Sequence, residues 1–390
     1  MDERLARQDD EIALGARLVN ARIVFGHKVA EGDLAIAGAL IVEAARPGAP
    51  ELDFGGDYLI AGLIDLHTDN IEHHFQPRPG VKWPSPMAAA LMHDWQILGS
   101  GITTVLDSLS IGDYDSGGKR TQMLHAAIGG VEAARAAGVL KADHYFHFRC
   151  ELSDPGLLPI IEAHIDNPYV RLLSMMDHTP GQRQWHDLEL YRRFRQKKNS
   201  EVWTDEAFAA YMADRLAKQT EFVPLARAII GKAGRARQIV MASHDDTTIA
   251  DVEQSHGDGI TISEFPTTLQ AARRARELGQ HIVMGSPNVV LGGSHSGNVG
   301  AMQLADEGLL DVLTSDYVPA SLLHAAFVLA HKSGDLPRAV ATVTSAPAAL
   351  VGMADRGRIA PGLRADLLRV RVVDGLPVVL GIWAAGRRFM

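Results

Sequence analysis

LIAGLIDLHTDNIEHHFQPRPGVKWP, residues 59–84, begins as an apolar strand, reaches His67 and Asp69 at its end, and continues as a loop with cations and prolines. Side chains at positions i and i+2 of a strand point to the same side. His67 and Asp69 can therefore converge on one ion. The loop adds Arg78 and Lys82, and its prolines stiffen it. The pair indicates a metal site, and the stiffened loop fits a preformed anion site but equally fits any rigid turn.

Beyond this stretch, short apolar runs alternate with longer segments of helical pattern. Strands are predicted near residues 60–67, 102–107, 143–151, 170–177, 238–243, 260–265, 281–285 and 311–315. Helices are predicted between them, for example over 87–99, 121–138, 205–232, 268–279 and 322–331. This alternation predicts an α/β protein with a parallel (β/α)8 TIM-like barrel. The polar segment 186–206 is expected to be an exposed insertion or a connection to a lid.

Both ends of the chain are β-rich. Residues 16–56 and 357–389 read as short strands that Gly, Pro and Asp interrupt. Two such ends can pair with each other. We therefore expect a small β-sandwich lobe made of residues 1–58 and 350–390, and a metal-dependent barrel made of residues 59–349.

Polar residues follow the predicted strands, at the rim where a barrel of this kind places its chemistry. In strand order they are His67 and Asp69; Asp107; Arg149 and Glu151; Asp177 and His178; His244, Asp245 and Asp246; Glu264; Ser286 and Asn288; Ser315 and Asp316. A lone His there is more often a hydrogen-bonded loop residue, and Asp107, Asp246 and Ser315 fit helix N-caps. Together, three His and three acidic residues at one rim favour a zinc or manganese site.

The chain resembles the amidohydrolase superfamily in its terminal β-lobe, its His-x-His-like pair, a later strand-end His and the final Asp316. A closer resemblance is to the PhnM family of the carbon–phosphorus lyase pathway. It rests on the opening stretch and on HDWQILGSGITTVLDSLSIGD, RCELSDP, MDHTPGQRQ, ASHDD, SEFPTT, MGSPNVVLGGSHSGN and TSDYVP, which cover most of the barrel. The resemblance implies a diphosphatase of phosphonate catabolism that converts α-D-ribose 1-methylphosphonate 5-triphosphate to the 5-phosphate and pyrophosphate.

The same resemblance implies a divalent-metal cofactor of two ions, with zinc as the first choice and manganese or magnesium as alternatives. The implied ligands are His67, Asp69, Glu151, His178, His244 and Asp316. The chain departs from the superfamily because Asp69 stands where a second His is usual, and no lysine suited to a carbamate bridge follows a strand. Glu151 is the candidate replacement for that bridge, and a one-metal site stays an alternative.

The implied reaction is attack of a metal-bound hydroxide on the α-phosphorus, with Asp316 as the catalytic base for the water. A triphosphate needs cations around it, and Arg forks match phosphate oxygens. Loop cations are also commonly only solvated. The predicted substrate-binding residues are Arg78, Lys82, Arg149, Arg183 and His295, the last in a Gly-rich loop whose backbone N–H groups can also bind phosphate.

The composition excludes several classes of protein. The 390 residues carry a formal net charge of −9, which argues against a basic nucleic-acid-binding face but not against a small anionic sugar in a locally basic pocket. No apolar run of membrane-spanning length occurs, and the charged N-terminus lacks the apolar region of a secretory signal. With Cys150 as the single cysteine, a reducing compartment, the cytoplasm, is expected. A homo-oligomer is left open.

Three alternatives compete with the diphosphatase. Hydrolysis of a cyclic amide or urea on the same fold predicts a neutral pocket, which the loop with Arg78 and Lys82 disfavours. A scaffold without activity predicts that the strand-end ligands are lost, although all six are present. A metal-dependent phosphodiesterase or nuclease is disfavoured by the acidic charge for long nucleic acids, but not for a nucleotide.

Overall fold

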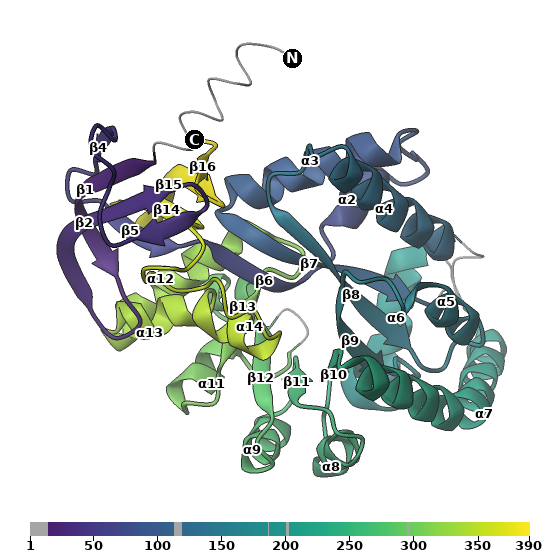
Figure 1. The fold of residues 1–390 in the computed structure, drawn as a ribbon. Helices are drawn as coiled ribbons and strands as arrows, with labels where there is room; N and C mark the ends of the chain where they lie inside the picture. Colours follow the sequence, from purple (N-terminus) through teal and green to yellow (C-terminus); the bar gives the residue numbers. More distant parts are fainter. Residues whose placement is uncertain (1–14, 113–118, 186, 200–202, 295–296) are drawn as a thin grey trace.

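A computed structural model of the protein describes residues 15–112, 119–185, 187–199, 203–294 and 297–390. Its centre is an eight-stranded parallel sheet in which each described strand pairs with the next along the chain (Figure 1). A parallel bridge between Thr68 and Asp316 brings the last strand back to the first and nearly closes the sheet into the predicted barrel. The strands are β6 (Leu63–Thr68), β7 (Ile102–Ile111), β8 (Asp143–Glu151), β9 (Val170–Met176), β10 (Val240–His244), β11 (Ile262–Glu264), β12 (His281–Gly285) and β13 (Val312–Thr314).

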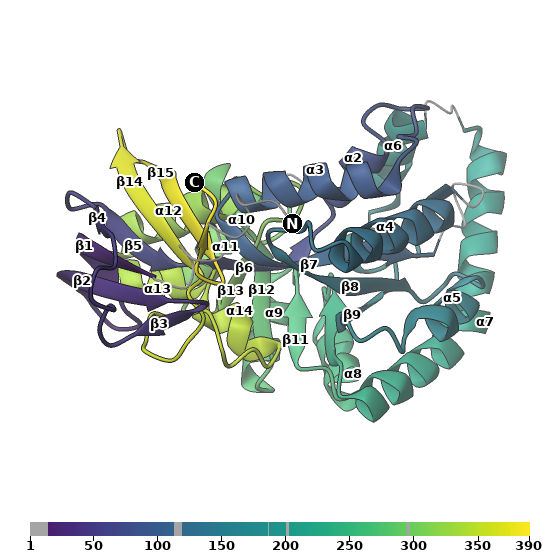
Figure 2. The same cartoon turned by 45° about the horizontal axis from the view of Figure 1, so that its top comes forward.

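Helices follow the strands and cover the outside of the barrel (Figures 1 and 2). The longer ones are α3 (Pro86–Gly99), α4 (Lys119–Ala136), α6 (Leu188–Asn199), α7 (Asp205–Arg237) and α12 (Ser321–Ser333). The shorter ones are α2 (Ile71–Phe75), α5 (Leu157–His164), η1 (Arg183–Trp185), α8 (Ile249–Gly257), α9 (Leu269–Glu277), α10 (Ser286–Val290), α11 (Ala301–Asp306), α13 (Leu336–Ala341) and α14 (Ser345–Leu350). Among the described helices, none combines the length and the hydropathy that crossing a lipid bilayer requires.

The opening stretch does not form one continuous strand. It divides at Gly62, with β5 (Tyr58–Ala61) in a separate sheet and β6 in the barrel. A Cβ on Gly62 would lie 2.2 Å from Oγ1 of Thr103, so only glycine allows the chain to pass this close to its neighbour. The strand predicted near residues 60–67 therefore serves two sheets.

The separate sheet combines segments from both ends of the described chain (Figure 2). Tyr58–Ala61 pairs antiparallel with a strand from the C-terminal part, with Ala61 opposite Leu367. The two β-rich ends therefore share one sheet, as expected. The exact domain limits stay a prediction. Besides β5, the strands are β1 (Ala16–Val24), β2 (Val29–Ala37), β3 (Leu40–Val42), β4 (Glu51–Asp53), β14 (Leu367–Val373), β15 (Leu376–Ala384) and β16 (Arg387–Arg388).

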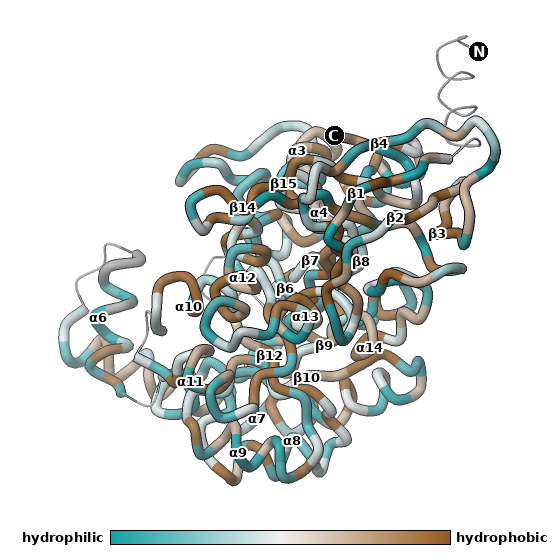
Figure 3. Tube along the Cα trace, turned by 90° about the vertical axis from the view of Figure 1, so that its left-hand side faces the viewer, coloured by the Kyte–Doolittle hydropathy of each residue, from teal (hydrophilic) through white to brown (hydrophobic). Residues whose placement is uncertain are grey.

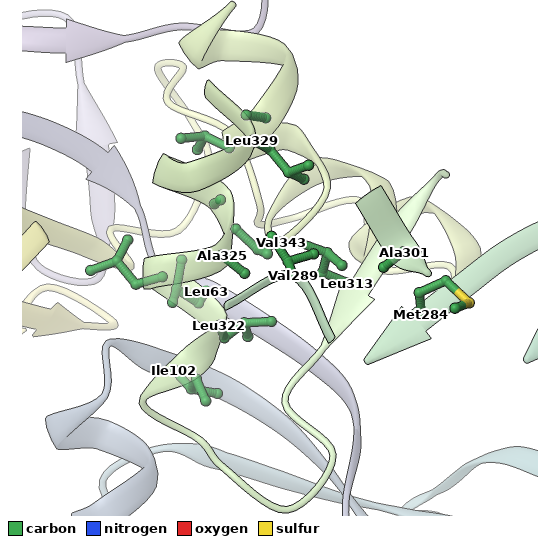
Figure 4. Packing of buried hydrophobic residues seen from close by; sticks show 14 of the residues in the cluster. Leu63, Ile102, Met284, Val289, Ala301, Leu313, Leu322, Ala325, Leu329 and Val343 are labelled. Atoms are coloured by element: carbon green, nitrogen blue, oxygen red, sulfur yellow. The ribbon is translucent and has the colours of Figure 1, made fainter. Parts of the chain in front are cut away.

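Apolar packing joins the barrel strands to the helices outside them. Leu63, Ile102 and Leu313 at the barrel wall pack in one cluster with Leu322 and Ala325 of α12 (Figure 4). All are buried, and removing apolar surface from water stabilises the fold by about 25 cal/mol per Å². The outer helices α6 and α9 carry many hydrophilic residues, as the teal in Figure 3 shows.

Three strand-end residues that fitted helix N-caps do not cap helices. Asp107 lies inside β7, where it is fully buried. Thr248 caps α8 instead of Asp246, and Ala320 occupies the cap position of α12 instead of Ser315. The capping explanation was therefore wrong for these residues.

The segment 186–206 is largely helical in its described part. Helix α6 spans residues 188–199, and α7 begins at Asp205 after an N-cap in which Thr204 accepts a hydrogen bond from the Ala207 N–H.

Candidate active site

A cavity of about 260 Å³ opens at the C-terminal ends of the barrel strands. Its lining includes Arg149 of β8, His244 of β10, and His178 and Asp316, which lie two residues beyond the ends of β9 and β13. These are the residues that the sequence placed at one rim. The structure therefore brings together side chains from distant parts of the chain at the face where barrels carry their chemistry.

Glu264, the last residue of β11, joins two imidazoles at the floor of this site. Its Oε1 lies 2.7 Å from Nδ1 of His67, and its Oε2 lies 2.7 Å from Nδ1 of His244. Burial by itself raises the pKa of Glu264, but attraction to His67 and His147 and the imidazole hydrogen bonds outweigh it and hold the pKa well below its usual value. Glu264 is therefore an ionised carboxylate.

His178 is held in a similar way by Glu151. Its Nδ1 lies 2.6 Å from Oε2 of Glu151, and its backbone N–H donates to Oε1 over 3.0 Å. The Nε2 atoms of His178 and His244 lie 3.6 and 3.7 Å from the same Asp245 oxygen, Oδ2. Burial lowers the pKa of His178, but the Glu151 and Asp245 carboxylates outweigh it and raise the pKa to about 9. Glu151 thus contacts a predicted ligand, and its role as a ligand itself stays a prediction.

Asp316 joins the end of β13 to the end of β6. Its backbone N–H donates to the His67 carbonyl over 2.9 Å, and its carbonyl accepts from the Asp69 N–H over 3.0 Å. Burial raises the pKa of the Asp316 carboxyl. Nearby, Nη1 of Arg149 lies 3.8 Å from Oδ2 of Asp69, so both residues share this side of the rim. These backbone bonds hold Asp316 at the cavity lining.

Three cavity-lining residues have a left-handed backbone: Asp245 (φ 57°), Phe265 (φ 54°) and Asp316 (φ 56°). Asp245 and Phe265 directly follow β10 and β11, and Asp316 lies two residues beyond the end of β13. Aspartate tolerates this conformation better than most residues, whereas for phenylalanine it is a genuine outlier. Strained residues of this kind cluster at functional sites because the surrounding structure holds them in place.

The donor atoms at this site fit a divalent metal. Nε2 of His67 is buried and has no hydrogen-bond partner within the described residues. His178, His244 and Asp245 offer ligand atoms that all lie within 4.8 Å of one another. Imidazole nitrogen and carboxylate oxygen are donors that zinc and manganese accept. An ion held here would give the buried Nε2 of His67 a partner.

No protein-family model matches the chain. Over 375 residues, the chain is 43% identical to the alpha-D-ribose 1-methylphosphonate 5-triphosphate diphosphatase of Escherichia coli (strain K12), and the match covers 95% of this chain and 98% of that protein. The chain belongs to this diphosphatase family, PhnM. It is an enzyme, a hydrolase, as the resemblance implied.

Solved structures place the PhnM chain on the amidohydrolase fold. One is an amidohydrolase at 15% identity with a TM-score of 0.61, covering 96% of this chain and 99% of its own. Another is the dihydropyrimidinase of Brevibacillus agri NCHU1002, at 15% identity with a TM-score of 0.58, covering 96% and 94%. A third is the N-acetylglucosamine-6-phosphate deacetylase of Pasteurella multocida, at 13% identity with a TM-score of 0.58, covering 96% and 99%. At these identities they show the fold alone.

The predicted substrate-binding residues lie in different places in the PhnM chain. Arg149 lines the cavity. Arg78 and Lys82 are exposed on the loop after α2, where Nζ of Lys82 donates to Gln122 over 2.8 Å, and neither is among the described lining residues. Their role in binding phosphate stays a prediction. His295 lies outside the residues that the structure describes.

Arg183 is buried and faces the end of β10. Its Nη1 donates to the His244 carbonyl over 3.0 Å and to Oδ1 of Asp246 over 2.5 Å, while its backbone has φ 48°. Asp246 is fully buried and also accepts a hydrogen bond from Ser243. Arg183 therefore holds the segment that carries His244, and its predicted contact with substrate stays untested.

Arg183→Met is expected to destabilise the protein by about 3 kcal/mol, because it leaves the buried Asp246 carboxylate without its cation. Urea unfolding checks this value. The matched control is Arg193→Met on α6, whose side chain is 70% exposed and whose ion pair with Glu189 should contribute less than about 1 kcal/mol. Unchanged stability with a raised KM would instead favour a direct contact between Arg183 and substrate.

Three residues of the site were not among the predicted ligands. Asp245 and Glu264 were noted only as strand-end residues, and His147 was not noted. The alternation of β8 gave a signal for His147, because His147, Arg149 and Glu151 share one side of the strand. No local signal separates Glu264 as a partner of two imidazoles from an ordinary strand-end carboxylate.

Proposed function

We propose that the protein hydrolyses α-D-ribose 1-methylphosphonate 5-triphosphate to the 5-phosphate and pyrophosphate in phosphonate catabolism. The 43% identity to a diphosphatase named for this substrate, over 95% of the chain, carries the proposal. The cavity supports it, because Arg149 and several imidazoles and carboxylates converge on one face. The reaction adds one water across the bond between the α-phosphorus and the bridging oxygen.

The proposed cofactor is one or two divalent ions, with zinc first. The residues that would hold it are His67, Asp69, Glu151, His178, His244 and Asp316, with Asp245 as an addition from the geometry. When bound, such an ion lowers the pKa of a water and offsets phosphate charge.

The chain's own residues supply the alignment that phosphoryl transfer needs. The Asp316 carboxylate, fixed by its backbone bonds to His67 and Asp69, accepts the proton of the attacking water. The Arg149 guanidinium binds phosphate oxygens and lies at the cavity wall. Phe265 packs on the rings of His67 and His244, with centroids 5.0 and 5.4 Å away, and excludes bulk water from them.

Other residues of the cavity lining support the proposed sugar end of the substrate. Gln184, Asn288 and Asn298 line the cavity and offer amide donors and acceptors for hydroxyl groups. Leu291 and Tyr317 add apolar surface to the lining. A lining that combines the Arg149 guanidinium with amide groups suits a molecule that carries both phosphate and hydroxyl groups.

Phosphorus NMR of the metal-loaded enzyme with the ribose phosphonate triphosphate tests the proposal, with ATP and a hydantoin as comparison substrates. We expect release of pyrophosphate from the phosphonate substrate, and loss of the reaction on chelation and in His67→Ala. If the phosphonate triphosphate stays intact while the hydantoin ring opens, the protein is an amide hydrolase and the proposal is wrong.

A further inference from the structure

We propose that Glu264 is a positioning residue that sets the tautomer and the orientation of His67 and His244 together, so that both keep Nε2, the nitrogen away from Glu264, as the atom for a metal. The inference rests on the proposed metal-dependent function. It adds a residue to that site: Glu264 is not one of the predicted ligands, but it orients two of them.

The hydrogen bonds of Glu264 determine the proton positions on both rings. Each of the two Glu264 oxygens lies 2.7 Å from an imidazole Nδ1, and because a carboxylate only accepts hydrogen bonds, this geometry places the hydrogen on Nδ1 of His67 and on Nδ1 of His244. In a neutral imidazole the lone pair is then on Nε2. All three side chains are at most 5% exposed, so water does not compete for these contacts.

The two rings are arranged as one unit. The His67 and His244 rings are nearly parallel, at 19°, with centroids 6.0 Å apart. Since both hold Nδ1 on the same carboxylate, their Nε2 atoms point away from Glu264. The buried Nε2 of His67 has no partner in the described part of the chain, and Nε2 of His244 faces Oδ2 of Asp245.

Glu264 itself is occupied by these contacts. Besides the two imidazoles, Oε2 accepts a hydrogen bond from Oγ of Ser174 over 2.9 Å. A carboxylate bonded to Nδ1 lies on the opposite side of the imidazole ring from an ion bound at Nε2. This arrangement matches the general pattern in which a metal-binding His donates its other N–H to a carboxylate.

Glu264→Gln should break this coupling while preserving size. The amide oxygen can still accept from one Nδ1, but the amide NH2 must donate to the other. That second ring is then forced to carry its proton on Nε2, where it has no lone pair for a metal. We expect the affinity for Zn²⁺ to fall about 10- to 100-fold, as for other partners of metal-binding His.

The first measurement is Zn²⁺ affinity by competition with a chromophoric chelator, on wild type, Glu264→Gln and the matched control Glu253→Gln. Glu253 is half exposed on α8 and pairs with Arg274, so its variant should bind Zn²⁺ like wild type. Equal affinity of Glu264→Gln and wild type would overturn the inference and leave the proposed function standing. Absence of Zn²⁺, Mn²⁺ and Mg²⁺ binding by wild type would instead overturn the proposed function.

The second measurement does not depend on the variant folding. Long-range ¹⁵N NMR of the histidine rings in the metal-free wild type reports which nitrogen carries the proton. We expect the Nδ1–H tautomer for both His67 and His244. An Nε2–H tautomer at either residue would contradict the proposed role of Glu264.

Discussion

Asp316→Asn is expected to lower kcat by about 10²–10⁴-fold, the usual contribution of a general base. Asparagine keeps the size of the side chain and tolerates the left-handed backbone at this position (φ 56°). The backbone bonds to His67 and Asp69 are also retained, because they use only main-chain atoms. The variant therefore removes the proton acceptor, and the charge of one proposed metal ligand, without disturbing these backbone contacts. Pyrophosphate release under saturating substrate measures the effect.

Asp374→Asn provides a matched control for this substitution. Asp374 also has a left-handed backbone, with φ 49°, but it is exposed between β14 and β15 in the terminal lobe. The same chemical change there should leave kcat as in wild type. A kcat for Asp316→Asn within about threefold of wild type, well short of the general-base effect, would show that Asp316 is not the base.

Asp107→Asn is expected to destabilise the protein by about 5 kcal/mol, the upper part of the range for breaking a buried charge pair. Asp107 lies inside β7 with no solvent exposure, and its two oxygens contact two different histidines. Nε2 of His93, on α3, lies 2.7 Å from Oδ1, and Nδ1 of His144, on β8, lies 2.8 Å from Oδ2. The amide of asparagine can replace only one of these acceptors.

The hydrogen bonds around Asp107 assign a charge to each histidine. His93 accepts at Nδ1 from the Asn70 amide over 3.2 Å, so it is neutral and donates to Asp107 through Nε2. His144 faces carboxylates on both sides, Asp107 at Nδ1 and Asp94 at Nε2, 3.3 Å away. His144 is therefore a buried imidazolium. Although these residues have metal-ligating chemistry, their ring nitrogens are all occupied within the cluster.

This cluster predicts a pH dependence of stability. Burial lowers the pKa of His144, but attraction and hydrogen bonds to Asp107 and Asp94 outweigh it and raise the pKa to about 9. The pKa of His144 in the folded protein exceeds the unfolded value of about 6.5. The contribution of His144 to the free energy of unfolding is therefore complete below about pH 6.5 and is lost as the pH rises through about 9. Wild type should lose stability over this window, whereas Asp107→Asn should show a weaker change.

Urea unfolding across this pH window checks both statements. Asp166→Asn is the control, because Asp166 is 78% exposed and its ion pair with Arg237 is a surface contact worth at most about 1 kcal/mol. If Asp107→Asn loses no more stability than the control, the buried cluster does not stabilise the fold.

Local sequence pattern predicted the barrel because hydrophobic periodicity reports which face of each element is buried. The strand 143–151 was predicted with the observed limits of β8, and the strand near 170–177 appears as β9, Val170–Met176. It was not predicted that residues 58–68 contribute strands to two different sheets. The chain divides at Gly62, whose close approach to Thr103 depends on packing between strands. Periodicity alone cannot report such a contact.

The sequence by itself determined the barrel, the rim of strand-end histidines and carboxylates, and, through resemblance, the diphosphatase family. Only the tertiary structure decided which of these side chains meet. His67 and Glu264 are 197 residues apart in the chain, yet their atoms lie 2.7 Å apart because β6 and β11 end at the same rim of the barrel. Arg183 likewise contacts Asp246 across 63 residues and becomes a buried partner of β10. Such pairs are fixed by how the strands close around one another, and no short-range pattern of residues encodes that closure.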